Sequence, residues 1–161
     1  AGKAVAEVVA PAGLRRGGAE TAATKRLFNI SKEEYEARAA IVEGAYLYKG
    51  CAIATSDELD PAMSVVLPMA ANDLLTINGV DASFVAVQVG NGVNVSARSM
   101  GAVNVQVIME SLGGGGHQTM AAAQLKHITP QAARSRIQDA IDQYYLSQKK
   151  TTPEARPAKG E

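Results

Sequence analysis

The chain is poor in aromatic residues and has no excess of charge of either sign. Its 161 residues contain no tryptophan and two phenylalanines, and aromatics make up 4% of the sequence although 47% of it is hydrophobic. Sixteen basic residues balance sixteen acidic ones. This balance excludes a strongly basic nucleic-acid coat and an acidic tail, so any phosphate binding has to come from a local site.

Cysteine and histidine are almost absent, and so are long apolar runs. The single cysteine, Cys51, excludes an intramolecular disulfide and a cysteine-rich zinc site. Only two histidines, His117 and His127, occur, which argues against a metal centre built from imidazoles. No run of about 18 apolar residues and no signal-peptide layout is present, so we expect no membrane segment in this chain. The start at Ala1 rather than Met suggests a processed or excised segment.

Stretches of helical and strand character alternate along the sequence. Helical spacing or caps occur at 19–28, 32–44, 63–77, 103–112 and from Thr129 onward. Because Pro68 lies inside 63–77, that helix either kinks there or begins near it. Strand-like runs occur at 49–55, 83–89 and 93–97, and 120–125 fits either a buried strand or a helical turn. This order predicts an α/β domain, with α+β as the alternative, in which a mixed sheet is flanked by helices.

Composition divides the chain into three parts. Residues 1–45 contain an Ala-, Val- and Gly-rich leader and then the helix at 32–44, which we interpret as a connector to a preceding domain. Residues 46–146 form the single compact domain. Residues 147–161 are polar and contain proline, and we predict that they are a disordered tail.

Four consecutive glycines, Gly113, Gly114, Gly115 and Gly116, precede His117. Glycine loses much backbone freedom when it is ordered, so such a run needs a compensating role. One role is to let successive backbone N–H groups surround an anion, with His117 donating to a phosphate or a base. The Lys-Ser/Thr of a Walker A loop is missing. The alternative is a flexible linker, although linkers usually contain serine and other polar residues.

A second candidate site is Ser96-Ala97-Arg98-Ser99, at the end of the strand predicted at 93–97. Strand alternation places Ser96 and Arg98 on one face, and a guanidinium can bind two phosphate oxygens at once. Taken alone, an exposed arginine at a strand end is the more common interpretation. Asn104 begins the next predicted helix, where it either orients a ligand or serves as a cap. We assign no catalytic residue and no metal ligand to this chain.

Several segments resemble the DHH-associated domain of DHH phosphoesterases. They are Ser96-Ala97-Arg98-Ser99, Val103-Asn104-Val105, and Gly113 to His117 followed by Ala121-Ala122. Two further segments, Ala71 to Leu75 and Gly79 to Phe84, are similar to the GdpP-type cyclic-di-AMP phosphodiesterases. Upstream, Leu14 to Ala19 and Lys25 to Leu27 look like the segment that joins the DHH domain to this one. The resemblance covers residues 14–146, about four fifths of the chain.

This resemblance implies a two-lobed bacterial enzyme. In the family, the DHH lobe holds two manganese ions, and the associated lobe closes over the cleft and binds the nucleotide and its phosphate. Carried over, the residues that contact substrate would be Arg98, Ser99 and the loop from Gly113 to His117, with Ser96 and Asn104 as further candidates. The expected partners are a cyclic dinucleotide or a short oligonucleotide, and the DHH lobe. The resemblance also implies a cytoplasmic domain whose parent is anchored in the cell membrane.

The sequence departs from the family pattern because it contains no Asp-His-His motif and no upstream Asp-x-Asp. A two-metal site needs several carboxylates and imidazoles around ions about 3.5–4 Å apart. We therefore expect the substrate-binding lobe alone, which binds no cofactor and is inactive as a fragment. One alternative is an RNA- or single-strand-binding module of a DHH-type nanoRNase or exonuclease, although near-zero net charge and scarce aromatics argue against it. Another is a docking lobe that only shapes its neighbour.

Overall fold

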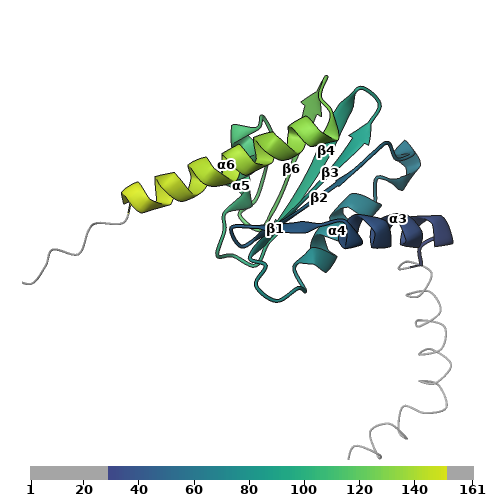
Figure 1. Ribbon diagram of the computed structural model, residues 1–161, viewed down its shortest axis with the longest axis horizontal. Helices are drawn as coiled ribbons and strands as arrows, with labels where there is room; N and C mark the ends of the chain where they lie inside the picture. The colour runs from purple at the N-terminus through teal and green to yellow at the C-terminus, as the bar shows by residue number, and fades with distance from the viewer. Residues whose placement is uncertain (1–28, 152–161) are drawn as a thin grey trace, which may run out of the picture. The chain divides into compact units, whose positions relative to one another are not determined.

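Six strands form one mixed sheet in the order β1-β2-β3-β4-β6-β5. Figure 1 shows β2, β3, β4 and β6 running beside one another. The computed structural model describes residues 29–151, so the predicted leader and the helix predicted at 19–28 lie outside the described residues. The strands are β1 Tyr46–Tyr48, β2 Cys51–Ser56, β3 Ala82–Val89, β4 Gly92–Ser99, β5 Gly115–Gly116 and β6 Met120–Lys126. β2 and β3 are parallel, whereas the other neighbouring strands are antiparallel. The prediction of an α/β domain with a mixed sheet is confirmed.

Helices cover both faces of this sheet. They are α3 Lys32–Glu43, α4 Val66–Leu74, α5 Val105–Ser111 and α6 Pro130–Thr151, with a 3-10 turn, η1, at Pro61–Met63. On one face, Ile53, Phe84 and Val95 pack with buried residues of α5 and α6. On the other face, Ala54 and Val85 pack with α3 and α4. Because the buried side chains are mostly alanine and valine, the two layers are filled by many small contacts rather than by aromatic rings.

The structure resolves the two ambiguous segments of the sequence. Residues 120–126 are a strand, not a helical turn, and their burial alternates strictly along β6. Pro68 lies in the first turn of α4, where backbone N–H groups have no partner within the helix, so the helix is not interrupted. The helix ends at Leu74, three residues earlier than predicted.

Two boundaries predicted from the sequence are wrong. The strand expected at 49–55 begins at Cys51, because Lys49 and Gly50 form a tight turn with φ of 49° and 77°. At the other end, α6 continues to Thr151, so residues 147–151 of the predicted disordered tail are helical. Hydroxyls of Ser147 and Thr151 donate to backbone oxygens one turn earlier. Lys149 and Lys150 lie in the last turn, where their positive charges interact favourably with the negative end of the helix dipole.

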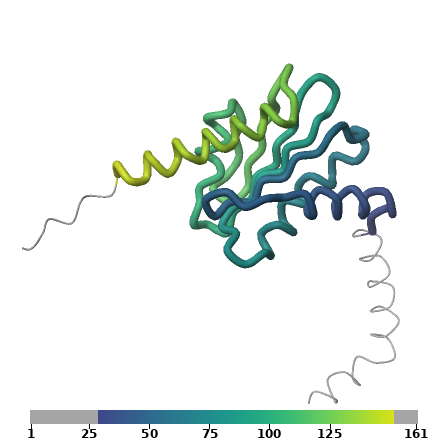
Figure 2. The backbone as a smooth tube through the Cα atoms, in the orientation of Figure 1, coloured from purple at the N-terminus to yellow at the C-terminus, as the bar shows by residue number. Residues whose placement is uncertain are grey.

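The helices leave part of the sheet uncovered. β4 and β6 are far apart in sequence but lie side by side (Figure 2). Their inward side chains are buried, and alternate residues point to the side of α3 and α4, where they remain partly or fully exposed. We call this surface the open face, and it consists of Gly92, Asn94, Ser96 and Arg98 on β4 and Met120, Ala122, Gln124 and Lys126 on β6.

Candidate functional site

Arg98, Met120 and His117 form one row across the sheet at the end of the open face. Arg98 is opposite Met120 in the β4–β6 ladder. The N–H of His117 donates to the Met120 oxygen at 2.6 Å, and the N–H of Met120 donates back at 3.3 Å. Opposed residues project to the same face, and neighbouring strands are about 4.8 Å apart, so the Cα atoms of Arg98 and His117 are separated by about 10 Å. The structure therefore brings together the two principal predicted site residues, with an exposed thioether between them.

The Arg98 guanidinium has no acidic partner among the described residues. Its Nη1 donates to the Ala97 carbonyl oxygen at 2.8 Å. Its Nε is buried and has no hydrogen-bond partner in the described part of the chain. Burial lowers the pKa of Arg98 because it disfavours the charged form. A partly buried cation with an unsatisfied donor is an attractive site for an anion.

Three of the four glycines are required by the fold itself. Gly113 ends α5 with φ of 84°, a conformation that favours glycine. A Cβ on Gly114 would lie 2.1 Å from the Ala122 oxygen, and one on Gly116 would lie 2.4 Å from the Met120 oxygen. A Cβ on Gly115 would meet nothing within 4 Å. The run is thus ordered, with Gly114 and Gly116 packed tightly against β6 and Gly115–Gly116 forming the short strand β5, and the flexible-linker alternative does not hold.

The backbone amides of the glycine run point in different directions. Those of Gly113 and Gly114 donate to the Glu110 and Met109 oxygens at the end of α5, at 3.0 and 2.8 Å. Because His117 and Met120 form a hydrogen-bonded pair, the alternation of an antiparallel ladder turns the Gly116 amide away from β6, toward the sheet edge. Of the successive amides predicted to surround an anion, the Gly116 amide beside His117 therefore remains available to a ligand.

The remaining candidate residues divide between the two faces. Ser96 lies on the open face, opposite Ala122. Ser99 is 5% exposed and faces inward, and its Oγ accepts a hydrogen bond from the Gly101 amide at 3.0 Å. Asn104 caps α5, since its Oδ1 accepts from the amides of Gln106 and Val107 at 3.1 and 3.4 Å. The side-chain oxygens of Ser99 and Asn104 thus serve the fold, as acceptors for backbone amides, whereas Ser96 and Arg98 lie on the open face.

The cap position of Asn104 leads to a testable prediction. Asn104→Ala is expected to lower the free energy of unfolding by about 1 kcal/mol, because two amides at the start of α5 lose their acceptor. Chemical denaturation measures this change. Affinity for an anionic ligand at Arg98 should stay within about twofold of the wild type at 25 °C, and a tenfold loss of affinity with unchanged stability would instead assign Asn104 to ligand contact.

The two histidines cannot share a metal ion. His117 precedes Met120 and His127 follows Lys126, so they lie at opposite ends of a strand that is about 20 Å long. Among residues 29–151 there is no group of three or more His, Cys, Asp or Glu side chains placed to hold a metal. Cys51 is fully buried, and burial raises the pKa of its thiol, as expected for a core cysteine. No helix in the described part of the chain is long and apolar enough to cross a membrane.

Polar residues farther along the open face were not predicted from the sequence. Asn94 and Gln124 are paired in register on β4 and β6, and Lys126 is opposite Gly92. The available signal was the period of two in residues 120–126, which places Ala122, Gln124 and Lys126 on one face once the segment is taken as a strand. Their pairing with β4 could not be predicted, because it joins segments about 30 residues apart in the sequence.

Comparison with known proteins agrees with this fold. The family model of the DHHA1 domain matches residues 49–146. The chain is 46% identical over 134 residues to the cyclic-di-AMP phosphodiesterase GdpP of Geobacillus thermodenitrificans, and 40% identical over 134 residues to PdeA of Listeria monocytogenes. Each match covers 82% of this chain and 20% of the relative. The chain therefore spans about one fifth of the length of these curated relatives.

Solved structures share the architecture at low sequence identity. An exopolyphosphatase-related protein from Bacteroides fragilis superposes with a TM-score of 0.67 at 16% identity, over 78% of this chain and 39% of that one. RecJ from Thermus thermophilus, solved with Mn²⁺, superposes with a TM-score of 0.51 at 16% identity, over 69% of this chain and 17% of RecJ. These similarities concern the fold alone.

Proposed function

The chain belongs to the DHHA1 domain family, and from that premise we propose that it is the substrate-binding lobe of a bacterial cyclic-di-AMP phosphodiesterase. In this proposal, Arg98 binds a phosphate of the dinucleotide, and His117 with the Gly116 amide binds phosphate or base from the sheet edge. Ser96 lies beside Arg98 on the same face and would contact the ligand through its hydroxyl. The 40–46% identity to the curated phosphodiesterases supports the choice of a cyclic dinucleotide.

The observation that carries this proposal is the unpartnered Nε of Arg98. A buried donor without a partner costs about 1–3 kcal/mol, and more when it is charged. A phosphate oxygen would satisfy this donor and also neutralise the guanidinium. The ion pairs Arg38–Asp73 and Lys49–Asp142 lie on other elements, and Arg98 has no carboxylate partner in the part of the chain that the structure describes.

Cleavage itself is assigned to a DHH lobe that this chain does not include. The described residues do not fit a two-manganese site, because no suitable cluster of ligands is found among them. In the proposed parent, the DHH lobe supplies the manganese, while Arg98 and His117 hold the substrate against it. The parent would be anchored in the cell membrane, with this domain on the cytoplasmic side.

Calorimetric titration of the 161-residue chain with cyclic-di-AMP tests this function. We expect saturable one-to-one binding through Arg98 and His117. We expect no linear product when Mn²⁺ is added, because residues 29–151 hold no cluster of metal ligands. Turnover above background would contradict the assignment of cleavage to another lobe. Tight binding of long oligonucleotides, with a steep loss of affinity as salt rises, would favour the single-strand-binding alternative. A chain that binds neither ligand would support the docking-lobe interpretation.

A further inference from the structure

We propose that Asn94 and Gln124 form a nucleobase-recognition subsite on the open face, and that they read the base of a nucleotide whose phosphate is held by Arg98. The inference rests on the proposed function for the position of the phosphate. It extends the proposed function by naming the two residues that would contact the base. The base they fit is one whose edge presents a hydrogen-bond donor next to an acceptor.

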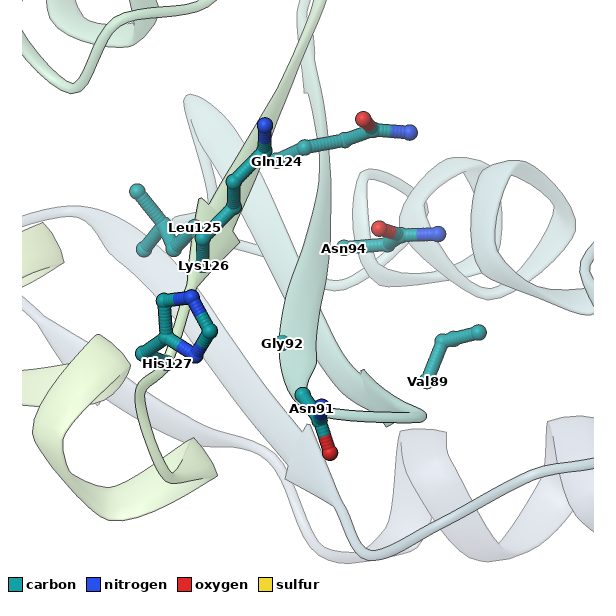
Figure 3. A pocket seen from close by; sticks show the side chains of 8 residues that line it. All are labelled: Val89, Asn91, Gly92, Asn94, Gln124, Leu125, Lys126 and His127. Atoms are coloured by element: carbon teal, nitrogen blue, oxygen red, sulfur yellow. The ribbon is translucent and has the colours of Figure 1, made fainter.

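A cavity of about 360 Å³ lies at the end of the open face that holds Asn94 and Gln124, opposite the end that holds Arg98. Figure 3 shows Asn94 and Gln124 projecting to the same side of the sheet, while the Leu125 side chain points to the opposite side. The lining of this cavity includes Asn91, Gly92, Asn94, Gln124, Lys126 and His127. Ligand pockets usually have volumes of about 300–1,000 Å³, so this cavity is large enough to hold a single base.

The two amides are available for a ligand. Asn94 and Gln124 are direct neighbours across the β4–β6 ladder. Neither side chain has a hydrogen-bond partner within residues 29–151. Each amide carries donors and an acceptor, and a carboxamide can pair in two places with adenine, through N6 and N7. Guanine presents two acceptors on the corresponding edge, which suits a cation better than an amide.

The spacing along the strands fits one nucleotide. Side chains on one face of a strand recur about every 6.6–7 Å, so the Asn94–Gln124 pair lies about 13 Å from the row of Arg98. The row between them contains Ser96, Ala122 and Gly115, which are all small. The space above Gly115 is open, because a Cβ there would meet no atom within 4 Å. We call this row of small residues the floor of the open face, and it leaves room for a ribose between a phosphate at Arg98 and a base at Asn94 and Gln124.

The charge of the open face also suits such a ligand. It carries the cations Arg98 and Lys126 and no carboxylate, although the whole chain is neutral. Lys126 lies next to Gln124 on the same face, beyond the proposed base position. A ligand with negative charge near Arg98 and a polar aromatic ring near the amides therefore meets complementary groups at both ends.

The experiment compares AMP with ribose 5-phosphate, which lacks the base, by NMR titration of the full 161-residue chain. In the wild type we expect AMP to bind at least about fivefold more tightly, the lower end of what one two-point amide–base contact supplies. In the double variant Asn94→Ala/Gln124→Ala this ratio should fall to about one, with the affinity for ribose 5-phosphate unchanged. Gln143→Ala, an exposed amide on α6, is the matched control and should keep the wild-type ratio.

The outcomes separate the inference from the proposed function. Equal affinities for the two ligands in the wild type, or a ratio that survives the double variant, would overturn the base subsite. Phosphate binding through Arg98 would then still stand. If Arg98→Met leaves the affinity for ribose 5-phosphate unchanged, the proposed function fails instead. A preference for GMP over AMP would contradict the amide assignment and point to Lys126.

Discussion

Replacing Arg98 by methionine is expected to weaken the binding of cyclic-di-AMP and of AMP by about tenfold or more. A hydrogen bond to a charged group contributes about 1.5–3 kcal/mol, and each 1.4 kcal/mol corresponds to a factor of ten in affinity. Methionine keeps much of the length and apolar volume of the arginine stem but offers no donor. Calorimetry on the wild type and the variant measures the change directly.

The same variant should fold at least as well as the wild type. Arg98 has no acidic partner among the described residues, and its buried Nε is unsatisfied, so removal of the guanidinium relieves a desolvation cost. We expect an unchanged or higher Tm. Arg98→Lys keeps the charge but loses the planar guanidinium. The affinity of this variant for cyclic-di-AMP should therefore lie between those of the wild type and Arg98→Met. A large loss of Tm in Arg98→Met with full binding would show that Arg98 has a structural role.

Gly114→Ala is expected to destabilise the domain by about 3 kcal/mol, the upper end of the usual cost of overpacking. The new Cβ would lie 2.1 Å from the Ala122 oxygen and 2.7 Å from the Ala123 Cβ. Both atoms belong to β6, so the β5–β6 pairing has to move before the methyl group fits. A loss of 3 kcal/mol corresponds to a decrease in Tm of roughly 10 °C, which differential scanning calorimetry measures.

Gly115→Ala is the matched control, since it adds the same methyl group one residue away. Its Cβ meets no atom within 4 Å, so the Tm should stay within about 2 °C of the wild type. The methyl group does, however, project onto the proposed floor of the open face, and nucleotide affinity should fall. Equal stability of the two variants would contradict the close packing of Gly114. Unchanged affinity in Gly115→Ala would argue against a ligand above that floor.

Local sequence signals predicted most of the secondary structure. Thr129 and Pro130 mark the start of α6, and Asn104 marks the start of α5, because caps act within one turn of the chain. The strand-like runs predicted at 83–89 and 93–97 correspond to β3 and β4, which pair as a hairpin around a short glycine turn. The end of α6 was misplaced because polar composition predicts disorder, whereas here the last turns continue the helix.

The sequence by itself determined the family resemblance, and it led to the prediction of Arg98 and His117 as the principal site residues, since both lie in short motifs. Only the tertiary structure decided what the neighbouring residues do. The second half of the glycine run, Gly115–Gly116, pairs with β6 as a short strand, and Ser99 faces inward. The Asn94–Gln124 pair exists only where β6 lies beside β4. The physical reason is that strand pairing joins distant segments, and its register determines which side chains share a face.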